Sequence, residues 1–141
     1  MSFRVMTYNI LDDGAGRELL ILEVVRAADP GIVILQEVGR LENDEMFAAA
    51  LHLNFGFIRG NSKRHLAVLS RFPILECHSY HPWPLSTALL EAKIELPGKR
   101  LLCLWGVHLA AQPLVLFELW RWWEIATILR RIRPVYRNRV C

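Results

Sequence analysis

Long apolar runs alternate with amphipathic stretches in the first part of the chain, and this pattern predicts strands and helices in turn. Residues 3–9 are rich in strand-forming side chains and predict a first strand. Residues 16–28 place leucines and valines at helical spacing among charged residues, so they predict an amphipathic helix that ends at Asp29-Pro30. Residues 31–38 are almost entirely apolar, which is typical of a central strand buried on both faces.

The remainder of the chain predicts a second helix, a series of strands and a last helix. Asn43 fits the N-cap of the second helix, which runs to about Leu53. The last helix begins near Pro113, a favoured first position, and runs to about Arg133. Strands are expected at about 55–59, 65–71, 74–80, 89–96 and 101–109. This order predicts an α/β (α+β) layered domain with about one mixed sheet flanked by helices.

The strand expected at 89–96 has the clearest alternation in the chain. Its apolar side chains, Leu90, Ala92, Ile94 and Leu96, alternate with Glu91, Lys93 and Glu95. Such a period of two predicts one buried face and one face in water.

The last helix is unusually apolar over residues 114–129 and carries three tryptophans, Trp120, Trp122 and Trp123. Its polar stripe is narrow. The favoured interpretation is an amphipathic helix that packs on the core, and a helix lying on a membrane surface is the alternative.

Composition narrows the class of protein. The chain of 141 residues is 53% hydrophobic and 22% charged, which excludes a disordered chain and fits one domain. No apolar run reaches the roughly 18–20 residues of a membrane span. The N-terminus enters a strand pattern with no signal peptide, and Cys77, Cys103 and Cys141 lack metal-ligand spacing. Reduced thiols and a cytoplasmic location are therefore expected.

The net charge of +3 depends on the C-terminal residues. Residues 130–141 hold five arginines and no acid, so residues 1–129 carry a formal charge of −2 without them. We therefore expect a domain over residues 1–133 and a basic tail over residues 134–141. The arginines fit a solvated helix end, and a nucleic-acid-binding module is the weaker alternative.

Three polar residues stand at the ends of three apolar strands: Asn9, Glu37 and His108. Each has an ordinary structural explanation, as a turn former, a salt-bridged cap and a core histidine. Together they fit one rim of a sheet, where α/β proteins bind ligands. A carboxylate there suits a hard cation such as Mg²⁺, an amide can hold a phosphate oxygen or a metal-bound water, and a histidine can donate to a phosphoryl oxygen.

The local sequence around these residues resembles the endonuclease/exonuclease/phosphatase superfamily, which has the DNase-I-like fold. The resemblance is carried by Arg4–Ile10, Ala28–Val38, the segment His65–Ile74 with its A-x-L-S-R-x-P-I pattern, Val107-His108-Leu109, and the R-x-x-E pair Arg121 and Glu124. It implies an α/β/β/α sandwich of which the chain contains the N-terminal half.

The resemblance also implies chemistry. Glu37, with help from Asn9, would bind Mg²⁺ (or Mn²⁺), Asn9 would also place the phosphate, and His108 would hydrogen-bond the scissile phosphoryl group. The reaction would be metal-assisted hydrolysis of a phosphodiester or phosphomonoester in a nucleic acid, a small phosphorylated molecule or a lipid headgroup.

The chain departs from the family pattern in its second half. The family's Gly-Asp-x-Asn and Ser-Asp-His motifs, which supply the water-activating histidine, are absent from the sequence. Many relatives also carry an arginine where this chain has Ser86-Thr87-Ala88. We therefore expect a truncated hydrolase that is weakly active or inactive alone. The alternative is a non-catalytic relative that binds a metal or a partner and self-associates through an exposed sheet face.

Overall fold

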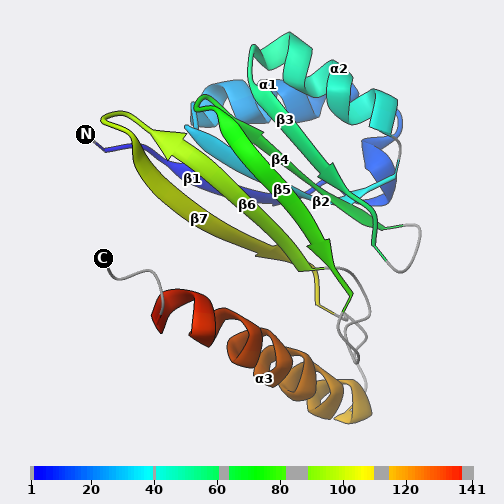
Figure 1. Ribbon diagram of the computed structural model, residues 1–141. Helices are drawn as coiled ribbons and strands as arrows, with labels where there is room; N and C mark the ends of the chain where they lie inside the picture. Colours follow the sequence, from blue (N-terminus) through cyan, green and yellow to red (C-terminus); the bar gives the residue numbers. More distant parts are fainter. Residues whose placement is uncertain (1, 40, 61–63, 82–88, 110–114, 138–141) are drawn as a thin grey trace.

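The computed structural model describes residues 2–39, 41–60, 64–81, 89–109 and 115–137, with the side chains of 41–44, 115–117 and 133–137 left out (Figure 1). The element order is β1 (Val5–Asn9), a 3₁₀ turn (Asp12–Gly14), α1 (Glu18–Ala28), β2 (Ile32–Val38), α2 (Leu41–Leu51), β3 (Asn54–Ile58), β4 (His65–Ser70), β5 (Ile74–Tyr80), β6 (Leu89–Leu96), β7 (Arg100–Val107) and α3 (Val115–Arg137). The predicted strands and helices are all present, in the predicted order.

The described strands form two sheets. The first has four strands in the order β1-β2-β4-β3, with β1 parallel to β2 and the other pairs antiparallel, so it is mixed as expected. The second contains β5, β6 and β7, all antiparallel. The fold class is confirmed, but the expectation of about one sheet is corrected. Because β4 is already flanked by β2 and β3, β5 finds no free edge beside it and begins a new sheet.

The core consists of two main layers. Helices α1 and α2 pack on one face of the first sheet, around Ile21, Val25 and Phe47 (Figure 1). The other face packs against the second sheet, where Val68 and Leu90 belong to one buried cluster. The central strand β2 is therefore covered on both sides, as its apolar run predicted.

The sheet face that was expected to be exposed is covered in the structure. The inner face of the first sheet packs against the chain's own second sheet. Among the described strands, β1 and β3 are the edge strands of the first sheet, and β5 and β7 are those of the second. Self-association stays a prediction, and these edges are the places where another strand could add.

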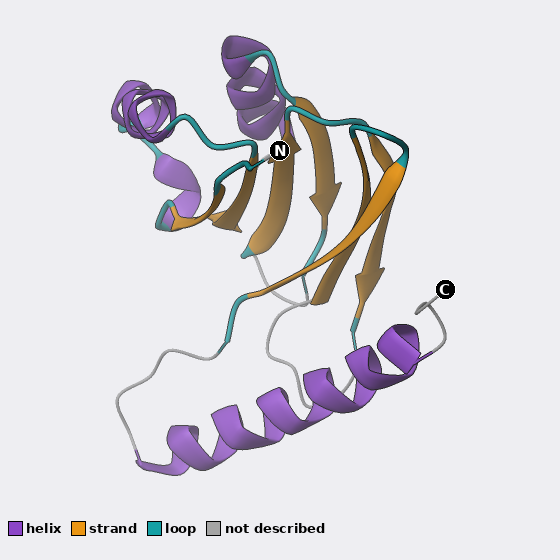
Figure 2. Ribbon diagram, turned by 90° about the vertical axis from the view of Figure 1, so that its left-hand side faces the viewer, coloured by secondary structure: helices purple, strands orange, loops and turns teal. Residues whose placement is uncertain are grey.

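Helix α3 lies apart from α1 and α2, next to the second sheet (Figure 2). Its Ile128 packs with Leu89 in a small cluster that also includes Trp105. This contact explains why the predicted wet face of β6 is covered at its start, where Glu91 is only 4% exposed. The carboxylate of Glu91 accepts hydrogen bonds from Tyr80 Oη at 2.7 Å and Cys103 Sγ at 3.2 Å.

Two helices have bounds that differ from the predicted ones. Helix α2 begins at Leu41, so Asn43 lies inside the helix and the predicted N-cap is wrong. Helix α3 continues to Arg137, and Pro113, its predicted start, lies outside the described residues. None of the described helices is both long enough and apolar enough to cross a bilayer.

Candidate functional site

Glu37 occupies a bulge near the end of β2. Gln36 pairs with Leu66 and Val38 pairs with His65, which leaves Glu37 as the extra residue of the bulge. Its φ is 60°, a left-handed value that costs a non-glycine residue on the order of 1 kcal/mol or more. The residue is only 5% exposed. Bulges and strained residues of this kind redirect side chains and cluster at functional sites.

Both oxygens of the Glu37 carboxylate have partners. Oε1 accepts a hydrogen bond from Asn9 Nδ2 at 2.9 Å and lies 3.3 Å from His108 Nε2. Oε2 accepts a hydrogen bond from the backbone N–H of Asp12 at 3.4 Å and lies 3.6 Å from Arg64 Nε. The structure therefore brings together Asn9, Glu37 and His108, the three residues predicted from the sequence. It adds a positively charged side chain, the guanidinium of Arg64.

Asn9 reaches Glu37 because β1 and β2 are parallel neighbours. Asn9 is in register with Gln36, so both strands end at the same edge of the sheet. The Oδ1 atom of Asn9 accepts a hydrogen bond from the backbone N–H of Leu11 at 2.9 Å. This bond fixes the amide so that its Nδ2 faces the carboxylate, and Asn9 orients Glu37 in this structure.

His108 comes from the second sheet, one residue beyond β7. Gln36 Nε2 donates a hydrogen bond to the Val107 carbonyl oxygen at 2.9 Å and so ties β2 to the end of β7. His108 is 9% exposed. The site therefore lies at the rim where the two sheets meet.

Arg64 belongs to the site but was not predicted from the sequence. It precedes β4, which pairs with β2, and its side chain is about half exposed (51%) beside the buried carboxylate. No local motif marks it. The available signal is only that a basic residue stands just before the strand that carries the A-x-L-S-R pattern.

The loop after β1 borders the same carboxylate. Leu11, Asp12 and Asp13 all have positive φ, at 53°, 48° and 65°. Asp13 Oδ1 accepts a hydrogen bond from the backbone N–H of Gly39 at 2.9 Å, which closes the loop over the end of β2. Such strained segments persist only where surrounding contacts hold them.

The electrostatics favour an ionised carboxylate beside a neutral imidazole. Burial alone would raise the pKa of Glu37, but hydrogen bonds from Asn9 and Asp12 and the charges of Arg64 and His108 outweigh it and hold the pKa below its ordinary value. For His108, burial lowers the pKa and Arg64 adds to this, against the opposing effects of Glu37 and Glu124. At neutral pH, Glu37 is therefore charged and His108 is neutral.

The buried Glu124 links α3 to this site. It is fully buried, and its charge is felt by His108. Its motif partner Arg121 forms an ion pair with Glu118 one turn earlier. The helix with the R-x-x-E pattern thus contributes a carboxylate to the surroundings of His108.

The donor chemistry fits a hard cation. Among the described residues, no group of three or more histidine, cysteine, aspartate or glutamate side chains gathers as a metal cage. Mg²⁺ does not require one, because it is often held by one or two carboxylates with waters and substrate phosphate oxygens completing its shell. Glu37 can supply that carboxylate, while Asn9 fixes its orientation.

Solved structures share this fold. The chain is similar to truncated TDP2 from Caenorhabditis elegans (18% identity, TM-score 0.75), covering 98% of this chain and 57% of that one. It is similar to a mannosyl-6-phosphatase from Bacteroides thetaiotaomicron (15% identity, TM-score 0.73), covering 99% of this chain and 62% of that one. It is also similar to the human Nocturnin catalytic domain with bound sulfate (22% identity, TM-score 0.65), covering 79% of this chain and 51% of that one. The chain thus spans little more than half the length of these relatives.

Sequence comparison places the chain more specifically than these structures do. No curated protein gives a significant match to it. The sequence profile of the Endonuclease/Exonuclease/phosphatase family, in contrast, matches residues 6–137, which include every residue of the site. The chain belongs to the endonuclease/exonuclease/phosphatase family and has its DNase-I-like fold.

Proposed function

We propose that this chain carries the metal-binding part of a divalent-metal-dependent phosphoesterase that hydrolyses a phosphodiester or a phosphomonoester. The observation that carries the proposal is the buried, ionised Glu37 at a strained bulge, held by Asn9 and His108. Family membership supports it, since the structural relatives include a mannosyl-6-phosphatase.

Each residue has a distinct role in this proposal. Glu37 binds Mg²⁺ (or Mn²⁺), which would supply Lewis-acid polarisation of a phosphoryl oxygen. Asn9 fixes the carboxylate and helps place the metal or the phosphate. Neutral His108 donates a hydrogen bond to the phosphoryl group as negative charge grows on its oxygens.

We infer that these 141 residues alone hydrolyse their substrate slowly or not at all. The family's Ser-Asp-His motif does not occur in the sequence, and a missing general base typically lowers the rate about 10²–10⁴-fold. The substrate class is a phosphate ester: a nucleic acid, a small phosphorylated molecule or a lipid headgroup. The odd number of cysteines, Cys77, Cys103 and Cys141, and their lack of metal-ligand spacing support the inference of a cytoplasmic location, where thiols stay reduced.

A second candidate is a non-catalytic relative that binds a metal or a partner. The free edges of β1 and β7 favour it, because unpaired backbone groups there can accept another strand. This candidate predicts a stable dimer by light scattering together with metal binding and no turnover.

The deciding experiment measures Mn²⁺ affinity by calorimetry for the full chain and for Glu37→Gln, with Glu23→Gln on the exposed side of α1 as the matched control. We expect Glu37→Gln to lose measurable binding and the control to bind as the wild type does. Unchanged binding in Glu37→Gln would show that the metal assignment is wrong. Hydrolysis of p-nitrophenyl phosphate and of a nitrophenyl phosphodiester, measured with the same proteins, separates the two candidates.

A further inference from the structure

One side of α3 packs against the second sheet. Glu124 is fully buried, Ile128 is 9% exposed, and Ile128 packs with Leu89. The guanidinium of Arg131 lies over the ring of Tyr80, 4.3 Å from its centroid. These contacts attach α3 to the second sheet and fix which side of the helix points outward.

The opposite side of α3 is apolar and open. Leu119, Trp122, Trp123 and Leu129 are 59%, 68%, 61% and 53% exposed. With the half-buried Ala126 they recur at helical spacing and form one continuous face, which we call the outer stripe. The apolar sequence of this helix predicted that it packs on the core, and this prediction is wrong for the outer stripe. No other described segment covers this side of α3 (Figures 1 and 2).

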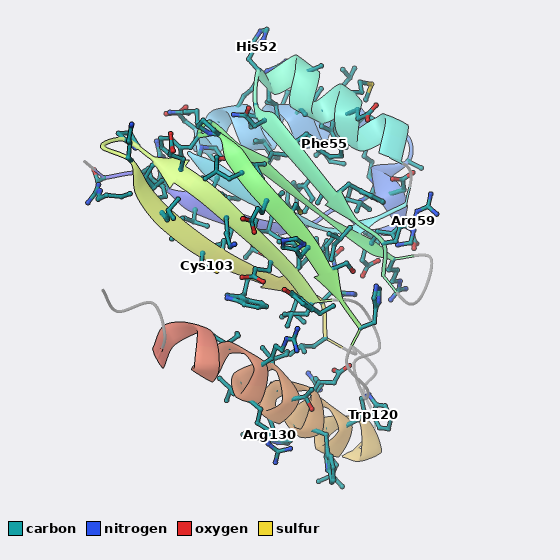
Figure 3. The ribbon with its side chains drawn as sticks, viewed as in Figure 1. His52, Phe55, Arg59, Cys103, Trp120 and Arg130 are labelled. Carbon is teal, nitrogen blue, oxygen red and sulfur yellow. The ribbon has the colours of Figure 1, made fainter. Side chains whose placement is uncertain are left out.

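Positive charge follows the outer stripe toward the C-terminus. Arg130 is exposed directly after Leu129, and Figure 3 shows it projecting from the side of α3 that faces away from the sheets. The sequence has five arginines between residues 130 and 141 and no acid after Glu124. Within the described part of α3, Glu118 is paired with Arg121 and Glu124 is buried, so the outward side is apolar and cationic.

We propose that the outer stripe of α3 binds an anionic phospholipid surface, with the helix lying in the plane of the membrane. Exposed tryptophan and leucine side chains on one side of a helix, together with arginines, are the composition of interfacial helices. Tryptophan rings favour the level of the headgroups, where one edge is apolar and the indole N–H is wet. The arginines meet the lipid phosphates, which is the charge complementarity that selects this occupant.

Other occupants match the outer stripe less well. Two copies of the chain paired through their outer stripes would find no unpaired acid on the described outward side of α3 to meet the arginines. A nucleic acid would meet the arginines and could stack on the tryptophans, but it would leave Leu119 and Leu129 without apolar contact. The proposal does not rest on the proposed hydrolytic function, because none of its residues contacts Glu37.

Flotation of the full chain with vesicles tests the proposal. The vesicles are phosphatidylcholine alone or with about a third phosphatidylserine, which gives the anionic surface potential of a cytoplasmic leaflet. We expect binding to the anionic vesicles with a blue shift of tryptophan emission. Trp122→Gln/Trp123→Gln should weaken binding at least about tenfold. The matched control is Leu101→Gln, which alters an exposed apolar side chain (65%) on β7.

The charge contribution is tested with Arg130→Gln/Arg133→Gln. At about 1 kcal/mol for each arginine near an anionic surface, binding should weaken by roughly tenfold to a hundredfold on anionic vesicles, with little change on phosphatidylcholine. Circular dichroism confirms that each variant is folded. Three results overturn the proposal: no vesicle binding by the folded wild type, a dimer that only the tryptophan variant converts to a monomer, or tryptophan-dependent binding of a single-stranded oligonucleotide without vesicle binding.

Discussion

The side-chain amide of Asn9 donates a hydrogen bond of 2.9 Å to the carboxylate of Glu37, and the two residues stand at the ends of parallel neighbouring strands. The bond matters because the carboxylate is buried and its backbone is strained. Asn9 is itself fixed by the N–H of Leu11. A chain of hydrogen bonds thus determines the direction of the carboxylate before any cation binds.

Replacing Asn9 should weaken metal binding although the carboxylate remains. Asn9→Ala removes the amide donor, so the pKa of Glu37 rises and its rotamer is no longer fixed. Partners that orient a metal ligand typically contribute about 10–100-fold in affinity. Calorimetric titration with Mn²⁺ measures the loss. Asn54→Ala, which removes an amide that bonds only backbone carbonyls on the far edge of the sheet, is the control. Equal losses in both variants would indicate a general effect on folding.

Replacing Arg64 should have the opposite effect on metal binding. Its guanidinium lies 3.6 Å from Glu37 Oε2 and competes with an added cation for the same charge. Because the side chain is half exposed, the pair is worth up to about 1 kcal/mol, and Arg64→Gln should tighten Mn²⁺ binding by up to about fivefold.

Arg100→Gln removes an exposed positive charge from the start of β7 and serves as the control for net charge. Weaker metal binding in Arg64→Gln than in Arg100→Gln would mean that Arg64 assists the cation.

The sequence was sufficient for the parts of the site that depend on strand order. The buried run of β2 and the polar residues that follow β1 and β7 are visible as patterns, and parallel pairing brings the ends of β1 and β2 together. Those patterns predicted Asn9, Glu37 and His108 as neighbours, and the structure has them in contact.

Features that depend on pairing between distant segments could not be predicted. The division into two sheets follows from β4 being flanked on both sides, which no local pattern records. The bulge at Glu37 has no glycine to announce it. Arg64 reaches the site only because Val38 pairs with His65. The outer stripe of α3 was interpreted as core because apolar periodicity does not tell which apolar side meets the protein.

Acidification should destabilise the metal-free protein in two steps. The pKa of His108 is lowered in the folded state, chiefly by burial, so the unfolded chain binds the proton first and stability falls as the pH drops below about 6.5. The pKa of Glu37 is also lowered on balance, because its hydrogen bonds and neighbouring charges outweigh burial, so a second loss follows below about 4.5.

Urea denaturation in the presence of a chelator, repeated between about pH 8 and pH 4, measures these steps. His108→Asn should remove much of the upper step and leave the lower one. A stability that stays flat from pH 8 to pH 5 in the wild type would contradict the environment assigned to His108.

Gly106 is where the two sheets approach each other next to the site. A Cβ on this residue would lie 3.2 Å from two carbons of Ile34 and 3.6 Å from Leu90 Cβ. Gly106→Ala should therefore push the end of β7 away from β2 and destabilise the protein by about 1–3 kcal/mol, as overpacking does. Because His108 follows two residues later, the same variant should also change the environment of its imidazole.

Gly56→Ala, on strand β3, is the matched control. A Cβ on Gly56 would crowd Val68 and Cys77 at 3.0 and 3.1 Å between the same two sheets. Urea denaturation should show a loss in both variants, while NMR titration of the His108 ring should shift only in Gly106→Ala. An unchanged His108 titration in a destabilised Gly106→Ala would show that the rim holds the histidine independently of the sheet spacing.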